Sequence, residues 1–167
     1  MDTPEIEQRL LTAGEEFDAA LAGLGLDAHA LFWAFDKDLG HHVLVLVTDF
    51  FDFKGPLAIS KALFRAYNAS ATPKEIDPFT IRLHSVNQPA GEKLLEIVNR
   101  GWSINKVDKR TNKLIGPAIP IKSVESGDLE IRPNWIISVR HSPDARKSTL
   151  LSRRWDRFQR NINLLAA

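Results

Sequence analysis

The chain has 167 residues, of which 44% are hydrophobic and 26% charged, and this composition excludes a disordered protein and a coiled coil. It contains no cysteine, which excludes a disulfide framework, a thiolate metal site and a cysteine nucleophile. Residues 1–99 hold 8 Lys and Arg against 15 Asp and Glu, and residues 100–167 hold 14 against 6, so the two parts carry −7 and +8. Such a basic second part suggests a nucleic acid or an acidic protein as partner.

The first predicted element is an amphipathic helix over residues 4–24. Thr3 and Pro4 are typical of a helix start, and Gly25 is typical of a helix end. Apolar residues recur between them at spacings of three and four. This narrow apolar stripe predicts that one face of the helix lies on a core.

Two apolar runs, ALFWAF at residues 30–35 and VLVLV at residues 43–47, follow the helix and are joined by a short polar link. This pattern predicts a β-hairpin. Neither run alternates apolar with polar residues, so we expect both strands to be covered on both faces at the centre of a sheet.

The link contains Asp36, Asp38 and His42, whose oxygen and nitrogen atoms are of the kinds that bind divalent cations. The spacing does not continue as a calcium loop, and neighbouring residues of an extended chain point to opposite faces. The alternative is the ordinary preference of Asp and Gly for turns. We favour the turn and expect neither a bound metal nor a cofactor.

Asp49 and Asp52 follow the second strand, just before a Gly55-Pro56 helix start. Acidic residues at strand ends beside a helix are placed where open α/β folds carry active sites, and His84 on a later strand is a further catalytic candidate. The alternative is that these acids cap a helix or close a turn. No phosphate-binding loop and no G-x-S-x-G motif occurs, so support for an enzyme is weak.

A helix over residues 56–68 and an alternating strand at residues 79–84 continue the chain, and this crossover length predicts a strand parallel to the one before it. A helix ending near Gly101 follows. The order of elements over residues 30–100 resembles that of a group of small uncharacterised bacterial α/β proteins. The resemblance supports the element order and implies no activity.

Residues 102–140 form a basic extension rich in short β-prone pieces and prolines, which we interpret as edge strands. Residues 103–107 and 113–115 are predicted to pair as a hairpin. A basic hairpin of this kind can follow a phosphate backbone, whereas the alternative is that lysines protect an edge strand from aggregation. The candidate contacts are Lys106, Lys109, Arg110 and Lys113.

The last predicted element is a helix over residues 143–165 with a regular apolar stripe. At about 100° per residue, four arginines form a row on the face opposite that stripe. Arginine suits the geometry of phosphate and carboxylate groups, and the alternative is an ordinary solvated face. The row consists of Arg146, Arg153, Arg157 and Arg160.

Together these elements predict one α+β domain, residues 1–167, with a central mixed sheet and amphipathic helices at both ends. The two terminal helices are expected to lie side by side or to exchange between the subunits of a homodimer. We expect a non-catalytic module whose basic half binds nucleic acid or an acidic partner. A metal-assisted hydrolase and a purely structural subunit are the alternatives.

The expected location follows from the absence of targeting signals in the sequence. The N-terminus is acidic and lacks the apolar segment of a signal peptide, and no run reaches the roughly 20 apolar residues that span a bilayer. We therefore expect a cytoplasmic protein without a membrane partner.

Overall fold

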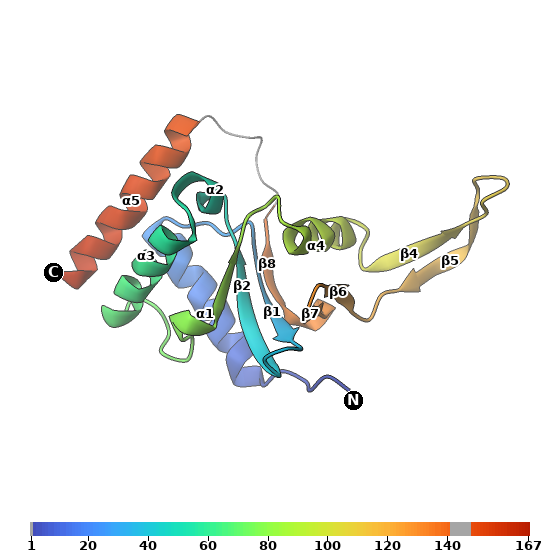
Figure 1. Cartoon of the computed structure of the whole chain (residues 1–167), viewed down its shortest axis with the longest axis horizontal. Helices are drawn as coiled ribbons and strands as arrows, with labels where there is room; N and C mark the ends of the chain where they lie inside the picture. Colours follow the sequence, from blue (N-terminus) through green and yellow to red (C-terminus); the bar gives the residue numbers. More distant parts are fainter. Residues whose placement is uncertain (1, 141–147) are drawn as a thin grey trace.

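The computed structural model describes residues 2–140 and 148–167, which form an α+β domain with a mixed central sheet (Figure 1). Within these residues the helices are α1 (Gln8–Leu24), α2 (Phe50–Lys54), α3 (Pro56–Asn68), α4 (Pro89–Asn99) and α5 (Ser148–Ala166), with 3-10 turns η1 (Pro78–Thr80) and η2 (Pro133–Trp135). The strands are β1 (Ala30–Asp36), β2 (His41–Val47), β3 (Ile81–His84), β4 (Ser103–Val107), β5 (Leu114–Pro120), β6 (Val124–Ser126), β7 (Leu129–Ile131) and β8 (Ile136–Val139).

The predicted hairpin is the centre of the sheet. β1 and β2 pair antiparallel along their whole length, from Ala30 opposite Val47 to Asp36 opposite His41. The Asp36 carboxylate accepts hydrogen bonds of 3.0 Å from the backbone N–H groups of Asp38 and Leu39, which closes the turn. Asp36 therefore has the turn-forming role that its residue type favours.

The strand order β3-β2-β1-β7-β6, with β8 also pairing with β1, makes both hairpin strands interior. β3 is parallel to β2, as the length of the α3 crossover predicted, and all other pairs in this sheet are antiparallel. The prediction of a mixed sheet with two buried central strands is therefore confirmed.

Helices α1, α3 and α5 and the short α2 cover one face of this sheet. Trp33 and Leu44 of the hairpin contribute to this core, together with Phe17 of α1, Ile59 of α3 and Phe158 of α5. Burial of these large side chains removes apolar surface from water and is the main stabilising contribution to the domain.

Helix α4 covers the opposite face. Its Leu94 is buried with Phe32, Val43 and Val45, whose side chains alternate with those of the first core along the same two strands. The two cores explain why neither apolar run of the sequence alternates with polar residues.

The N-terminal helix begins at Gln8, not at residue 4 as the sequence suggested. Thr3 Oγ1 donates a hydrogen bond to the Glu130 carboxylate, and Arg132 binds both the Glu5 carboxylate and the Thr3 carbonyl. These contacts hold residues 3–7 as a strap against β7 and the residue that follows it, so Thr3 does not cap the helix.

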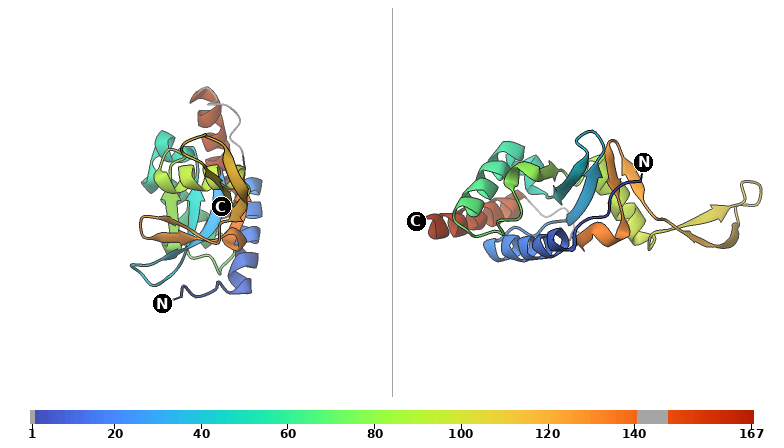
Figure 2. Two further views of the ribbon diagram at one scale, coloured as in Figure 1. Left: turned by 90° about the vertical axis from the view of Figure 1, so that its right-hand side faces the viewer. Right: turned by 90° about the horizontal axis from the view of Figure 1, so that it is seen from below.

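The basic extension is not a uniform set of edge strands. β7 and β8 pair with β1 and so complete the central sheet, whereas β4 and β5 pair with each other and with no other described strand. The β4–β5 hairpin projects from the domain as a separate arm, residues 103–120, in Figure 1 and in the right-hand view of Figure 2. Lys106 and Val107 pair with Ile115 and Leu114 as the sequence predicted, but the pairing continues to Pro120, beyond the predicted segment 113–115.

Both terminal helices pack on the same domain and contact each other within one subunit. The backbone of Phe158 in α5 approaches within 3.6 Å of the position that a Cβ on Gly25 would occupy. Gly25 ends α1 with φ 107°, a conformation that favours glycine. Part of the predicted helix, residues 143–147, lies outside the described residues.

Among the helices that the structure describes, none combines the length and apolarity needed to cross a bilayer.

Candidate functional site

The β4–β5 arm ends in a short loop that is ordered by its own hydrogen bonds. The N–H of Asp108 donates to the carbonyl of Lys113 over 2.8 Å, and the N–H of Asn112 donates to the carbonyl of Asp108 over 2.7 Å. The Asp108 carboxylate accepts from the N–H of Arg110 over 2.8 Å. Local bonds rather than packing against the domain therefore shape the tip of the arm.

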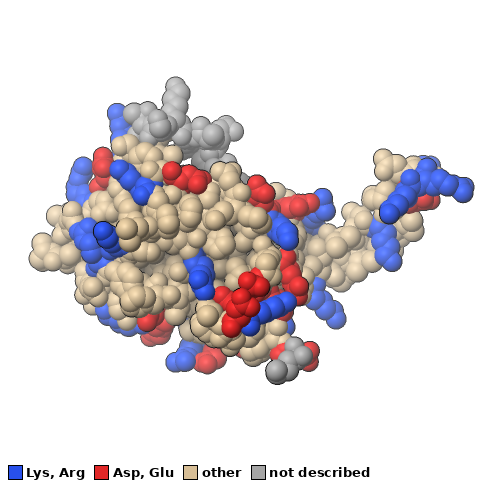
Figure 3. Space-filling view, in the orientation of Figure 1, with Lys and Arg blue, Asp and Glu red and all other residues tan. Residues whose placement is uncertain are grey.

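Four exposed cations gather on this arm, and Figure 3 shows Lys and Arg side chains at its outer end. Asp108 is the one acidic residue between positions 103 and 120, so this segment carries a net charge of +3. Between described residues, no ion pair involves any of the four cations. They are the predicted Lys106, Lys109, Arg110 and Lys113.

The predicted arginine row lies on α5. Arg153, Arg157 and Arg160 are exposed, whereas Arg146 lies outside the described residues. Helix α5 and the arm occupy opposite ends of the molecule (Figure 1). The two predicted basic surfaces therefore do not form one continuous surface.

Asp49, just after β2, has two side-chain partners, Arg154 and His29. Arg154 of α5 donates to Asp49 Oδ2 over 2.7 Å, and His29 Nε2 lies 3.5 Å from the same oxygen, while Asp49 Oδ1 has no partner among the described residues. Burial raises the pKa of Asp49, but the hydrogen bonds and charges of His29 and Arg154 outweigh it and hold the pKa below its usual value. The Arg154 guanidinium also lies 5.1 Å from the centre of the Phe50 ring.

Asp52 and His84, the other catalytic candidates, lie in different surroundings. Asp52 accepts hydrogen bonds from the hydroxyl of Ser85, at 2.5 Å, and from the side-chain amide of Asn87. His84 lies on the face of β3 opposite Leu83, which packs in the α1–α3–α5 core. Burial, and then the charge of Arg82, lower the pKa of His84. Between described residues, no hydrogen bond or ion pair links the side chains of any two of the three candidates.

The metal-ligand candidates are also separated. Asp36 binds Arg82 over 3.1 Å on the α4 side of the sheet, whereas His42 shares the other face with Leu44. Asp38 lies in the exposed turn between the strands. Within the described residues, no three His, Asp or Glu side chains are placed to hold a metal ion.

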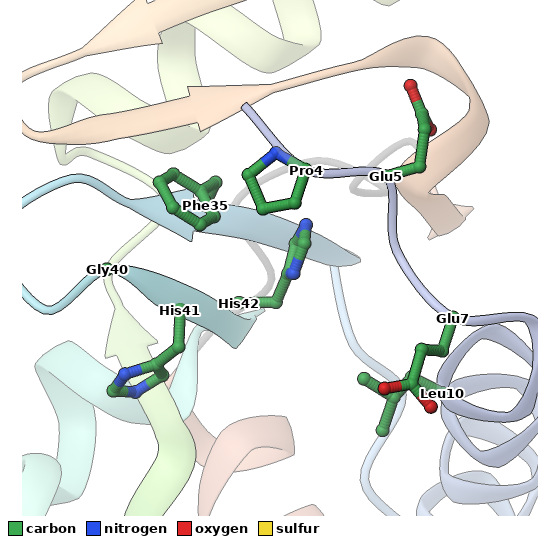
Figure 4. A pocket seen from close by; sticks show the side chains of 8 residues that line it. All are labelled: Pro4, Glu5, Glu7, Leu10, Phe35, Gly40, His41 and His42. Atoms are coloured by element: carbon green, nitrogen blue, oxygen red, sulfur yellow. The ribbon is translucent and has the colours of Figure 1, made fainter. Parts of the chain in front are cut away.

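A pocket of about 350 Å³ lies under the N-terminal strap, beside His42 (Figure 4). The His42 ring packs edge-on against Phe35 at 5.3 Å and Trp135 at 4.9 Å, and its Nε2 has no hydrogen-bond partner among the described residues. The two glutamates that line the pocket, Glu5 and Glu7, pair with Arg132 and Arg9. These carboxylates are therefore already engaged within the chain.

Replacing His42 by phenylalanine should flatten the dependence of stability on pH between 7 and 5. Burial, and then the charge of Arg132, lower the pKa of His42 in the folded state. As the pH falls below the pKa of an unfolded histidine, about 6.5, the unfolded chain binds a proton that the folded chain does not, so stability falls. Urea unfolding at several pH values measures this slope.

The matched control for that experiment is His41→Gln, because His41 is exposed on the same strand. The control should retain most of the pH slope, because burial and the charge of Arg132, the main causes of the lowered pKa of His42, are unchanged. Equal slopes for His42→Phe and the unsubstituted chain would show that His42 is not held neutral in the fold.

Sequence reasoning missed Arg154, although a signal was present. Arg154 is three residues from Leu151 and four from Phe158, so it borders the apolar stripe instead of belonging to the row on the opposite face. An arginine in that position is placed to bind a carboxylate near the edge of a core. The strap contacts of Arg132 had no local signal, because their partners lie more than 120 residues away in the sequence.

Comparison of the chain with models of protein families, with curated protein sequences and with solved structures finds no match.

Proposed function

We propose that this protein is a non-catalytic nucleic-acid-binding module and that the tip of the β4–β5 arm provides the contact. The observation that carries the proposal is the group of four exposed cations on an arm that stands clear of the domain. Cations that form no internal ion pair can neutralise phosphates and release counterions, which drives binding to nucleic acid.

The shape of the arm supports the same function. A two-stranded β-ribbon is one of the elements that fit the major groove of B-DNA, which is about 12 Å wide. Asp108 orders the loop by accepting a hydrogen bond from the N–H of Arg110, so the cations of the tip start from a defined conformation. Ordering before binding lowers the entropic cost of association.

The arm is a better candidate than α5 for the first contact. The arginines of α5 lie along one face of a helix docked on the domain, whereas the arm reaches outward from it. We place this activity in the cytoplasm.

An acidic protein is the alternative partner, and the experiment below distinguishes binding to nucleic acid from binding to an acidic protein.

Neutralising the tip by the triple substitution Lys109→Ala, Arg110→Ala and Lys113→Ala should weaken binding to a labelled DNA duplex or RNA about tenfold or more at 50 mM salt. Because each phosphate contact contributes about 0.9 to the slope of log affinity against log salt, that slope should fall by about 3. Fluorescence anisotropy at several salt concentrations measures both quantities.

A matched control removes the same charge from the other end of the molecule, by Arg153→Ala, Arg157→Ala and Arg160→Ala. This variant should bind nearly as the unsubstituted chain does. The proposal fails if neither DNA nor RNA is retained at low salt, if both triple variants lose affinity equally, or if polyglutamate binds as tightly as nucleic acid.

A further inference from the structure

The shaft of the arm, residues 103–107 and 114–120, exposes an apolar face. Ile104 lies opposite Ile119 and Lys106 lies opposite Ile115. Since cross-strand partners and residues two apart on one strand share a face, the three isoleucines lie on the same side of the arm. Ile104 is 51% exposed, Ile115 is 53% exposed and Ile119 is 45% exposed. The β4–β5 hairpin pairs with no other described strand, and an isolated two-stranded hairpin is only marginally stable in water. An added strand would therefore stabilise it.

The exposed area of the chain leaves room for an interface. The accessible surface is 9902 Å², whereas a compact monomer of 18.8 kDa has about 8,300 Å². The excess of about 1,600 Å² exceeds the roughly 800 Å² that each partner of a standard interface buries. Residues 104–107 and 109–120 of the arm are all exposed, so the arm contributes to this excess.

No described strand pairs with the outer edge of β4. The N–H of Ile121 donates to the carbonyl of Trp102 over 2.7 Å, and the N–H of Asp108 donates to the carbonyl of Lys113 over 2.8 Å. Because the backbone groups of an antiparallel strand point alternately toward and away from its neighbour, those of Ser103, Asn105 and Val107 point away from β5.

The outer edge of β5 is blocked. Residues 116–118 lie opposite Asn105 alone, which makes β5 bulge, and Gly116 takes φ 67° there. Pro117 and Pro120 have no N–H to donate to a further strand. The arm therefore has one edge that accepts a strand and one that does not.

We propose that the β4 edge is a dimerisation surface, on which β4 of a second copy of this chain pairs antiparallel about a two-fold axis at Asn105. The three outward positions are symmetric about Asn105, so the edge is complementary to itself, as a two-fold interface requires. Ser103 then lies opposite the partner's Val107, and the stem of Lys106 lies along the partner's Ile104. The dimer is a four-stranded ribbon with six isoleucines on one face.

Charge favours this antiparallel arrangement. The loop at Arg110 is five residues from Asn105, so at about 3.3 Å per residue the two cationic tips lie roughly 33 Å apart. This distance is several times the Debye length of about 8 Å, so the tips do not repel each other appreciably. The spacing is also close to one turn of B-DNA, about 34 Å, and the inference that both tips contact one duplex rests on the proposed function.

The mass of the unsubstituted chain, measured by sedimentation over a range of concentrations, should be that of a dimer. Asn105→Pro removes an outward N–H and adds a ring on the open edge, but it leaves the bonds between β4 and β5 intact. It should raise the dissociation constant of the dimer at least a hundredfold, whereas Asn105→Ala should leave it nearly unchanged. A monomeric unsubstituted chain, or an equally tight Asn105→Pro dimer, would overturn the proposal.

A cross-link gives a second test that does not depend on the fold of the proline variant. The chain has no cysteine, so Asn105→Cys introduces a single thiol, and pairing at the axis brings two such residues to about 5.5 Å, within reach of a disulfide. Oxidation should give a covalent dimer of Asn105→Cys but not of Lys109→Cys. Equal cross-linking of both variants, or of neither, would contradict the proposed axis.

The two proposals fail separately. A dimer that retains no nucleic acid would refute the proposed function alone, and a monomer that binds nucleic acid through the arm would refute the dimer alone. The triple tip variant should remain dimeric, because its substitutions lie outside the paired strands.

Discussion

Replacing Phe158 by alanine is expected to lower the free energy of unfolding by about 3–5 kcal/mol. Phe158 is fully buried in α5 and packs against Phe50 and Trp155, with ring centres 6.1 and 5.8 Å away. The substitution leaves a cavity at the point where the C-terminal helix meets α2, and the fixed backbone around it cannot close the space. Urea unfolding followed by tryptophan fluorescence measures the change.

Leu164→Ala is the matched control for Phe158→Ala, because Leu164 lies on the same helix and is 71% exposed. Its effect should remain within about 0.5 kcal/mol. A loss of less than 1 kcal/mol for Phe158→Ala would mean that α5 does not pack on the domain as the structure describes.

Gly14→Leu should be the second strongly destabilising substitution, with a loss of about 1–3 kcal/mol from overpacking. A Cβ at this position of α1 would lie 2.9 Å from Ile137 Cδ1 and 3.0 Å from Trp33 Nε1, which is closer than a packed core permits. Trp33 is held there by the hydrogen bond that its Nε1 donates to the carbonyl of Leu10 over 3.1 Å. The glycine thus allows the helix to approach the sheet.

Gly23→Ala provides the control of opposite sign. Gly23 lies in the same helix, and a Cβ there would meet no atom within 4 Å. Alanine should therefore stabilise the domain by about 0.5–1 kcal/mol through its better helix propensity. Thermal and urea unfolding of both variants measures these changes. If both glycine substitutions were stabilising, the close approach of α1 to the sheet would be disproved.

The centre of the fold could be predicted from the sequence because its signals are local. The continuous apolar runs VLVLV and ALFWAF indicate that both faces of each strand are covered. The length of the crossover that begins at Pro56 indicates that the next strand is parallel to β2. Gly14 shows the limit of such reasoning, since in sequence it only weakens a helix, and its role depends on Trp33 and Ile137.

The pairing of β7 and β8 with β1 could not be predicted because these strands are short and lie far from β1 in the sequence. β7 is the three-residue segment Leu129–Ile131, too short for a periodic signal, and it pairs with Phe35 and Asp36. Of the candidate site, the basic hairpin was indicated by its composition. Its separation from the arginines of α5 depends on the tertiary arrangement and had no signal in the sequence.

The late pairing of β1 has a consequence for synthesis on the ribosome. Asp36 pairs with Leu129, which is synthesised 93 residues later, so the second neighbouring strand of β1 is absent until then. At translation rates of about 5–20 residues per second, this delay lasts roughly 5 to 20 s. During that interval one edge of the apolar β1 strand has no partner in the nascent chain, and unpaired strand edges of this kind are prone to aggregation until β7 and β8 emerge.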